Sequence, residues 1–450
     1  MKKFFETLSN IWKIEDLRVR IINTLLFLLI YRMGSFVVLP GVIYGTLNPQ
    51  NGTAGLLGML NMFAGGSFSR ASIFALGVMP YISASIVVQL LGIAVPYFTK
   101  LQKEGESGRN KLNQWTRYLT IAITAVQAVA YVRSQIDVTK QVSPEISAFA
   151  FNLMSVVILT AGTLFVMWLG EKITDKGIGN GISLIIMVGI IAQLPGALSS
   201  EFVVRTTGHG GLFTFIVELL FLIGVVMFTI LIVQGTRKVA VQYAKRIVGN
   251  KQYGGVRQYI PLKVNAAGVM PIIFAQALMF IPAYIPQLFP SSASNPIVMS
   301  MANYSSWAHN IIFGIFIIVF TYFYTAITIN PSQMADDMKK NGGFIPGIKP
   351  GRSTSEFIDG ILSRITLPGS IFLAIIAVIP PIATYIGVSQ MFARFYGGTS
   401  LIILVGVVLD TLQQIESHLL MRHYDGLMKT GRITGRTSVP TSAGTSPPVI

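Results

Sequence analysis

The stretch SIFALGVMPYISASIVVQLL, from Ser72 to Leu91, is apolar enough to lie in a membrane, yet it contains one glycine, one proline and three serines. A helix of about twenty apolar residues spans a bilayer, and a segment that only anchors a protein has no need of this mixture. Ile82 and Ile86 are four residues apart, so on a helix they share one face. The stretch therefore predicts a membrane-spanning helix and raises the question of what that face contacts.

The composition of the whole chain agrees with a membrane protein. Of its 450 residues, 52% are hydrophobic and 12% are charged, whereas soluble domains carry about 25% charged residues. A soluble fold interrupts its apolar runs with polar faces, but several runs of about twenty residues carry almost no charge here. An all-α, polytopic membrane protein is therefore expected. The absence of cysteine excludes disulfides, thiolate metal sites and cysteine nucleophiles.

Ten segments have the apolarity of membrane spans, and two of them are short. Two sets of five spans have opposite orientations, which is the arrangement of transport proteins built from inverted repeats, although no clear repeat of residues is visible. The expected spans cover residues 19–39, 71–96, 117–132, 149–170, 181–196, 212–234, 264–283, 308–329, 366–387 and 400–418.

Basic residues are unevenly distributed between the two sides of these spans. Of the 34 Lys and Arg residues, 28 lie in, or at the border of, segments on the N-terminal side and five lie on the other side, while Arg32 falls within the first span. Positively charged loops remain in the cytoplasm, so both termini are expected there. The net charge of +16 is thus first a signal of topology.

The two ends of the chain lie outside the expected spans. Residues 1–18 predict a short amphipathic cytoplasmic helix, and they lack the apolar core and cleavage site of a signal peptide. Residues 419–450 are expected to form a cytoplasmic tail. Its end, GRITGRTSVPTSAGTSPPVI, is rich in Gly, Ser, Thr and Pro and is expected to be disordered.

Two long cytoplasmic loops, 235–263 and 330–365, have patterns typical of folded segments. The first holds seven Lys and Arg residues and no acid, and its alternation of apolar and basic residues predicts two strands around a basic turn. The second predicts a helix, a Gly/Pro turn and another helix. These loops either only obey the positive-inside rule or bind a polyanionic partner such as ribosomal RNA, an acidic protein face or lipid headgroups.

The spans contain few ionisable residues: Arg32, Glu218 and Asp410 lie within or near them. A secondary transporter of a small solute is one alternative function, but it keeps ionisable groups inside its spans for a coupling ion, and the scarcity of such groups argues against it. No residue constellation of an intramembrane protease is present, and no phosphate-binding loop of the G-x-x-x-x-G-K-[ST] type. A basic lipid-binding scaffold without a pore is a further alternative.

Five separated motifs occur in this order along the chain: SIFALGVMPYISAS, EKITDKGIGNGISLII, YIPLKVNAAGVMPIIFA, FIPGIKPG and FYGGTSLII. In order and spacing they resemble the SecY family, the channel subunits of the Sec protein translocase, and the similarity covers roughly residues 1–430. The resemblance implies a passive protein-conducting channel rather than an enzyme, with no cofactor and no metal site.

The architecture that the resemblance implies has two halves of five spans, 19–196 and 212–418, joined near residues 196–212. The halves enclose an hourglass pore that passes unfolded polypeptides across the membrane and releases hydrophobic segments sideways into lipid. Residues 55–69 resemble a plug on the outer side, and they are too few to span a bilayer. The implied plug residues are Met62, Phe63, Ala64, Gly65, Gly66 and Ser67.

The resemblance also implies a ring of apolar side chains at the middle of the pore. Such a ring excludes water and ions by dewetting and still parts for a chain; for each residue alone, packing against a neighbouring helix is the other interpretation. Met270 stands where isoleucine is commoner, and its flexible thioether seals as well. The implied ring consists of Ile82, Ile86, Ile186, Ile190, Met270, Ile273 and Ile403.

In the same family a lateral gate lies between the second and third spans and the seventh and eighth. Weak hydrogen bonds would hold its seam closed, and the polar residues expected there are Ser83, Ser85, Gln127 and Gln276. The basic loops match the docking surfaces of the family for the ribosome and the motor ATPase SecA. The implied docking residues are Lys245, Arg246, Lys251, Arg257, Lys349 and Arg352. Lys349 replaces a usual arginine and so lacks its planar fork.

The partners implied by the resemblance are SecE-like and SecG-like small membrane subunits, SecA, the ribosome, signal sequences and nascent polypeptides, and membrane lipids, including anionic ones. The implied location is the inner (plasma) membrane of a bacterium, with several passes and both termini in the cytoplasm.

Overall fold

The protein is mostly helical and polytopic. Among the residues that the structure describes, six helices are long and apolar enough to cross a membrane, and a seventh candidate is a helix pair bent by 103° at a break. Five short strands accompany these helices in the described residues, so "all-α" holds for the membrane part and not for the loops. The computed structural model describes residues 12, 14–43, 55–137, 141–144, 146–207, 211–243, 246–248, 251–253, 257–288, 295–303 and 305–429.

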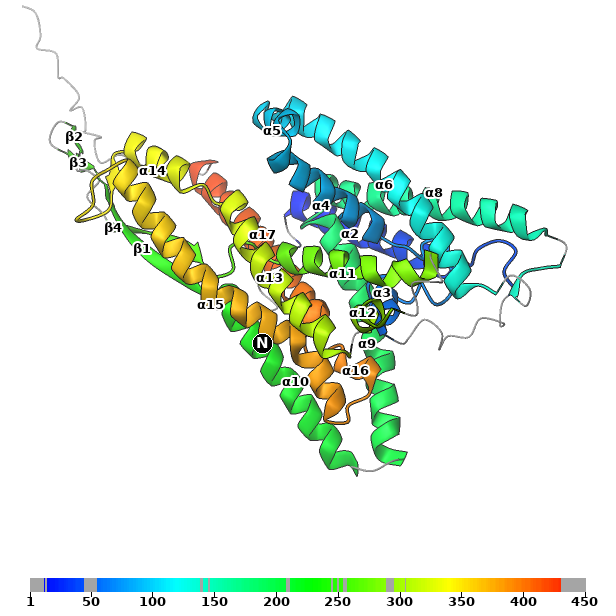
Figure 1. The fold of residues 1–450 in the computed structure, drawn as a ribbon. Helices are drawn as coiled ribbons and strands as arrows, with labels where there is room; N and C mark the ends of the chain where they lie inside the picture. Colours follow the sequence, from blue (N-terminus) through cyan, green and yellow to red (C-terminus); the bar gives the residue numbers. More distant parts are fainter. Residues whose placement is uncertain are drawn as a thin grey trace, which may run out of the picture.

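Helices from the first part of the chain pack together and form what we call the first helix group (Figure 1). Within it, α2 and α6 both contact α8, α4 contacts α6, and α8 contacts α9. The group consists of α2 (Glu15–Gly34), α4 (Met79–Ala94), α5 (Pro96–Lys103), α6 (Glu106–Gln135), α8 (Ala148–Lys176) and α9 (Gly181–Thr207).

Helices from the rest of the chain form the second helix group. In it, α15 contacts α10, α13 and α17, while α11 contacts α13. The two groups meet where α11 packs on α4 and α6, and where α9 packs on α10, α16 and α17. The group consists of α10 (Gly211–Gln234), α11 (Met270–Leu288), α12 (Pro296–Ala302), α13 (Trp307–Thr328), α15 (Arg352–Tyr385), α16 (Gln390–Ala393) and α17 (Gly398–Lys429).

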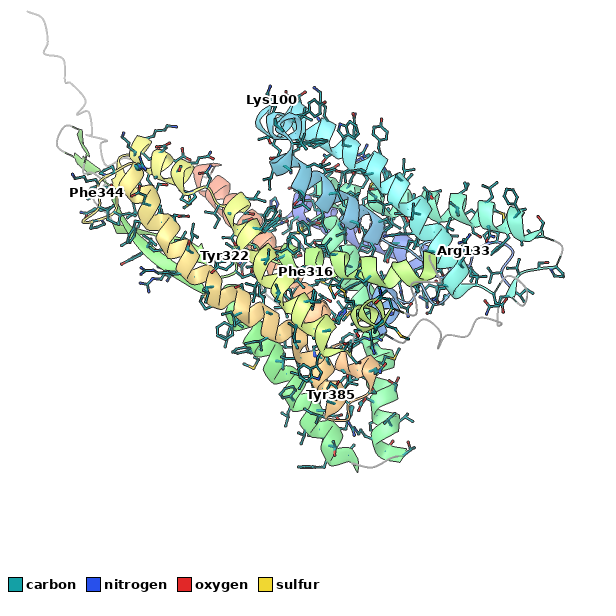
Figure 2. The ribbon with its side chains drawn as sticks, viewed as in Figure 1. Lys100, Arg133, Phe316, Tyr322, Phe344 and Tyr385 are labelled. Atoms are coloured by element: carbon teal, nitrogen blue, oxygen red, sulfur yellow. The ribbon has the colours of Figure 1, made fainter. Side chains whose placement is uncertain are left out.

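A small sheet and one helix, α14 (Pro331–Lys340), lie at one end of the second helix group, opposite to α16 and to the adjoining ends of α9 and α10 (Figure 1). Side chains mark these ends in Figure 2, with Phe344 beside the strands and Tyr385 far from them. The three-stranded sheet has the order β4-β1-β5, and β2 pairs with β3. The strands are β1 (Thr236–Tyr243), β2 (Arg246–Val248), β3 (Lys251–Tyr253), β4 (Arg257–Lys263) and β5 (Gly343–Phe344).

The sheet has a hydrophobic core of its own, separate from that of the helices. Val239 and Val241 of β1 are buried against Met338 of α14 and against Ile358 and Leu362 of α15. Alternate residues of a strand point to opposite faces, which is why only every second residue of β1 enters this core. The two loops expected to be structured are therefore one folded unit.

Several element boundaries differ from the expected spans. The helix expected at 71–96 begins only at Met79 and ends at Ala94, because Val95 precedes Pro96 and a residue before proline disfavours the helical conformation. The span expected at 264–283 begins at Met270, whereas the short span expected at 181–196 is a helix that continues to Thr207 despite Pro195. Residues 1–11 and 430–450 lie outside the described residues.

Residues 55–78, which precede α4, form neither a membrane span nor a surface loop. They comprise α3 (Gly55–Phe63) and then a series of turns to residue 78. Phe63, Phe68 and Phe74 are each buried, with at most 5% of their surface exposed. The segment also pairs with the chain after α2, since Leu39 N donates to Ala71 O and Ile73 N donates to Val37 O. This segment thus lies within the helix bundle.

Candidate pore constriction and plug

Four helices bring apolar side chains to one small cavity, which we call the pore cavity. Ile82 comes from α4, Ile186 from α9, Ile273 from α11 and Ile403 from α17, and Phe63 of α3 closes one side. The centre of a water molecule has about 10 Å³ available there, roughly the room that one water needs. The full lining is Phe63, Met79, Ile82, Ile186, Ile273, Gln276 and Ile403.

The other three residues of the expected ring belong to, or pack against, the same hydrophobic core but do not line this cavity. Ile86 and Ile190 are buried, with 3% and 0% of their surface exposed, but neither lines the pore cavity. Met270 lines a larger hollow beside Lys263 and Asp410. The structure thus brings four of the seven residues together, one from each of four helices.

This lining is suited to stopping water and ions. Branched aliphatic side chains offer no hydrogen bond to a hydrated ion, and a constriction of this width favours the dry state. Gln276 is the polar exception: it is 2% exposed, and its Nε2 has no hydrogen-bond partner in the described part of the chain. A buried, unsatisfied amide costs about 1–3 kcal/mol. The cavity is therefore apolar and expected to be dry, and its one amide donor, Gln276 Nε2, has no partner in the described residues.

The turn after α3, in the segment expected as a plug, is held through a backbone carbonyl. Arg32 Nη1 donates to Gly65 O at 2.7 Å, and Arg70 Nη2 donates to the same oxygen at 2.9 Å. Both guanidinium groups also lie over the ring of Phe36, at 4.8 and 4.4 Å from its centre. Gly65 has φ +64°, a conformation that favours glycine. Charge-assisted bonds thus fix this turn against the end of α2.

Helix α9 provides the surface on which this segment lies. Gln193 Nε2 donates to Asn61 O at 2.7 Å. One turn earlier, at Gly189, the two backbones almost touch, because a Cβ at that position would lie 2.4 Å from Phe63 O. Ile186, one turn further back, lines the pore cavity. One face of α9 therefore both lines the pore cavity, through Ile186, and supports the segment that ends at Phe63, through Gly189 and Gln193. We call this second contact the seat of the segment.

This contact gives a direct test. Replacing Gly189 by valine inserts a side chain where Phe63 O lies, so the segment must move from its seat. We expect the Gly189→Val protein to fold and to conduct ions at rest, which planar-bilayer recordings measure. Gly196→Val on the same helix is the control, since a Cβ there meets nothing within 4 Å. Equal conductance of the two variants would contradict this seat.

The four polar residues expected at the lateral seam do not bond across it. Ser83 Oγ donates to Met79 O at 3.2 Å, and Gln89 Nε2 donates to Ser85 Oγ at 3.3 Å, both within α4. Gln127 Oε1 on α6 is buried without a partner in the described part of the chain, as is Gln276 Nε2 on α11. Helix α11 packs on α4 and α6 where the seam is expected, and in the described part of the chain these four side chains form no hydrogen bond between those helices.

The docking residues that the structure describes lie on three strands, on the turn before α15 and at the start of α15. Lys349 is exposed, and Arg352 Nε bonds Glu356 Oε1 at 3.0 Å on the surface. Lys245 lies outside the described residues. The remaining three lie on strands: Arg246 on β2, Lys251 on β3 and Arg257 on β4.

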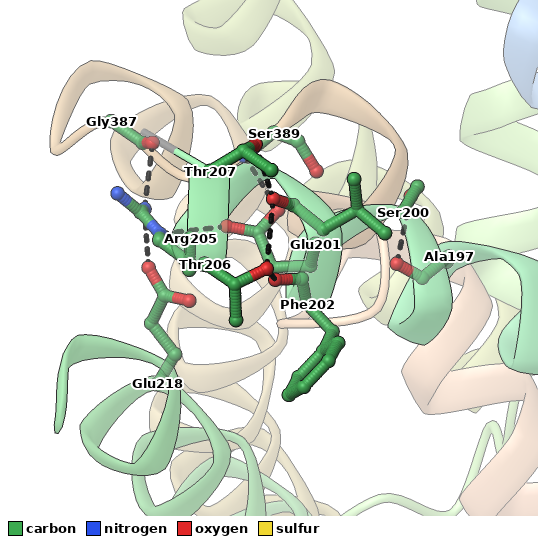
Figure 3. Close-up of polar contacts among 11 residues, drawn as sticks. Ala197, Ser200, Glu201, Phe202, Arg205, Thr206, Thr207, Glu218, Gly387 and Ser389 are labelled. Carbon is green, nitrogen blue, oxygen red and sulfur yellow. Dashed lines mark hydrogen bonds and ion pairs between the residues drawn. The ribbon is translucent and has the colours of Figure 1, made fainter. Parts of the chain in front are cut away.

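A buried ionic cluster near the end of α9 was not anticipated as a unit, although Glu218 had been noted as a rare charge in a span. Arg205 Nε donates to Glu201 Oε1 at 3.0 Å, and its Nη2 bonds Glu218 Oε1 and, at 2.8 Å, Gly387 O (Figure 3). Glu201 Oε2 accepts from Ser389 N at 3.1 Å. We call Glu201, Arg205 and Glu218 the α9 clasp. It ties the end of α9 to α10 and to the α15–α16 turn.

Together these features define a helical membrane channel closed by an apolar constriction and a short inserted segment. The SecY family model matches residues 72–412. The protein translocase subunit SecY of Streptomyces scabiei is 43% identical, over 94% of this chain and 99% of the relative. That of Thermotoga maritima is 39% identical, over 96% and 100%. The chain belongs to the SecY family, and it is a channel subunit of a protein translocase, not an enzyme.

Solved structures share the fold at low sequence identity. "The structure of a protein conducting channel" superposes with a TM-score of 0.64 at 16% identity, over 93% of this chain and 95% of the other. "Sec61 in the Canine ribosome-channel complex from the endoplasmic reticulum" gives 0.62 at 17%, over the same shares. The arrangement of helices described above is thus that of known protein-conducting channels.

Proposed function

We propose that a polypeptide crosses the membrane through the pore cavity, between Ile82, Ile186, Ile273 and Ile403, after the segment that ends at Phe63 has moved aside. The observation that carries this proposal is the convergence of four helices and this segment on one dry cavity. Apolar side chains bind no particular sequence, which suits a path for varied chains. The larger, more polar hollow lined by Asn180, Met270 and Asp410 would form the cytoplasmic approach.

The first and second helix groups would be the two halves of a ten-span channel, with the lateral gate along the contact of α11 with α4 and α6. In this proposal the joint between the two halves lies within α9, at Pro195. Before Pro195, α9 meets α8 at Gly181 and α3 at Gly189; after it, the α9 clasp and the contact of Ser200 Oγ with Met391 Sδ, at 3.9 Å, attach α9 to the second group. Pro195 lacks the N–H of a helical hydrogen bond, so bending is easiest there.

The orientation follows from charge. We infer that the sheet, α14 and the α5 bend face the cytoplasm of a bacterium and that both termini do so as well, because the basic loops gather there. The translocase partners are then SecE-like and SecG-like subunits, SecA or a ribosome, and signal sequences. Support for the ribosome comes from the fold shared with a ribosome-bound channel, and anionic lipids complement the same basic surface.

The chain has no cysteine, so single cysteines can report the path of a translocating polypeptide. In membranes with a secretory precursor halted halfway, we expect precursor cysteines to crosslink to Ile82→Cys, Ile186→Cys and Ile403→Cys. Leu220→Cys on α10, with 63% of that leucine exposed toward lipid, should stay uncrosslinked. The expected contrast arises because only the cavity positions meet the chain.

Two outcomes would count against the proposal. Crosslinks at Leu220→Cys that match those at the cavity positions would indicate a path along lipid. No crosslinks at any cavity position, together with transport of a small solute against an ion gradient, would favour the secondary transporter.

A further inference from the structure

Strand β1 has one edge that is largely open. On one side β4 pairs with all of β1 but its last residue, from Thr236↔Lys263 to Gln242↔Arg257. On the other side β5 pairs only with Gln242 and Tyr243. Pro346 follows two residues after β5 and has no N–H, so it does not extend that pairing. In the described part of the chain, residues 236–241 have no strand on this side.

The register shows which backbone groups face the open edge. Val264 N donates to Gly235 O at 2.8 Å, in line with the β1–β4 register. In an antiparallel pair the residues alternate between bonding to the partner and pointing away from it. Odd-numbered residues of β1 therefore bond to β4, whereas Lys238 and Ala240 direct N–H and C=O to the open edge. Gln242, which is also even-numbered, is paired with β5.

A groove of about 390 Å³ runs beside this edge. Six of its eight lining residues are apolar, and the other two are basic. None is acidic. The lining consists of Arg237, Lys238, Val239, Ala240, Ile345, Pro346, Phe357 and Ile361.

The surroundings add positive charge. Arg364 lies seven residues after Phe357 and three after Ile361 on α15, so it shares their face of the helix. The nearby carboxylate of Glu356 forms a salt bridge with Arg352, with Glu356 Oε1 3.0 Å from Arg352 Nε. An open strand edge beside apolar side chains is the surface to which an extended peptide adds as a further strand. A nucleic acid would bind the basic side chains, but it would form no strand with the open edge of β1 and would not fill the apolar groove.

We propose that the open edge of β1 binds an extended segment of a cytosolic partner protein, with acidic and apolar side chains in alternation, as an added strand. The proposal rests on the proposed function in one respect, namely that the sheet faces the cytoplasm. Backbone bonds from Lys238 and Ala240 would provide affinity, the apolar groove would receive alternate side chains, and Arg237, Lys238 and Arg364 would select for acids.

The probe is a fluorescent peptide of alternating glutamate and valine, added to the full chain in lipid nanodiscs. We expect it to bind, and Ala240→Pro to weaken binding about tenfold, through one lost hydrogen bond and the bulk of the ring. Proline is tolerated on an edge strand where the N–H faces outward, so the sheet should persist. Ala240→Val, which keeps the N–H, is the matched control, and Lys238→Glu should weaken binding as well.

Amide hydrogen exchange of β1 gives a second readout, because a peptide held only by ionic contacts would leave the exchange rates of the backbone amides unchanged. The amides of Lys238 and Ala240 should exchange more slowly when the peptide is bound. Equal affinity for Ala240→Pro, or binding of an oligouridylate in place of the peptide, would overturn the proposal. Crosslinking of halted precursors in the same variants separates the two proposals, because loss of the edge leaves the path through the pore cavity unchanged.

Discussion

Replacing Ile186 and Ile403 together by serine is expected to make the resting channel permeable to ions. Each substitution removes about 1.5–3 kcal/mol of apolar burial from the closed cavity. This raises the equilibrium ratio of hydrated to dry pore by at least about tenfold. Both residues line the pore cavity and are 2% exposed. Conductance of the reconstituted protein in planar bilayers measures the effect, with no precursor present.

Two controls separate a leak from damage to the fold. Ile186→Leu keeps the volume and the apolarity, so the seal should hold. Ile185→Ser removes an equally buried side chain from the same helix, 0% exposed but not part of the cavity lining. It should lower stability without a leak. A serine pair as tight as the unaltered channel would show that the constriction lies elsewhere.

Loss of Arg205 is expected to have the largest effect on stability. Arg205→Leu leaves Glu201 and Glu218 buried without their cation, and removing one member of a buried ion pair costs about 3–5 kcal/mol. Glu201 is 0% exposed and Glu218 is 8% exposed. We expect the melting temperature of the detergent-solubilised protein to fall markedly. The onset of aggregation on heating measures it.

The matched variant is Glu218→Gln, which keeps the Arg205–Glu201 bond and should melt close to the unaltered protein. The double variant with Arg205→Leu and Glu218→Gln should be more stable than Arg205→Leu alone, because one orphaned charge is gone. If Arg205→Leu melted with the unaltered protein, the α9 clasp would have no role in holding α9 to the second helix group.

Helix α9 shows how much of the candidate site the sequence can predict. Motif and helical spacing place Ile186 on the face that reaches the pore cavity, but they place Ile190 there equally. Only the crossing of α9 with the segment at Gly189 decides between them, since the backbone of that segment occupies the next turn. Helix periodicity describes a face and contains no information on where a neighbour crosses it.

The contacts missed by sequence reasoning join distant parts of the chain or use the backbone. The α9 clasp unites Glu201, Glu218 and the turn at Gly387, which no local pattern connects. Gly65 O, which accepts from Arg32 and Arg70, is a carbonyl that every residue possesses. The seam residues were expected to bond across the seam; Ser83 bonds instead within its own helix, where the acceptor four residues earlier is always near.

The attachments of the turn at Gly65 have a consequence for the order of opening. In the described part of the chain, residues 55–78 accept hydrogen bonds from Arg32 on α2, from Gln193 on α9 before Pro195, and from Tyr131 on α6, whose hydroxyl donates to Phe68 O at 2.6 Å. All three belong to the first helix group. If the second group swings away about Pro195, as proposed, Ile273 and Ile403 leave with it, while the inserted segment stays behind. In that proposal the channel has two barriers in series, and a signal sequence that parts the seam removes one and leaves the other in place.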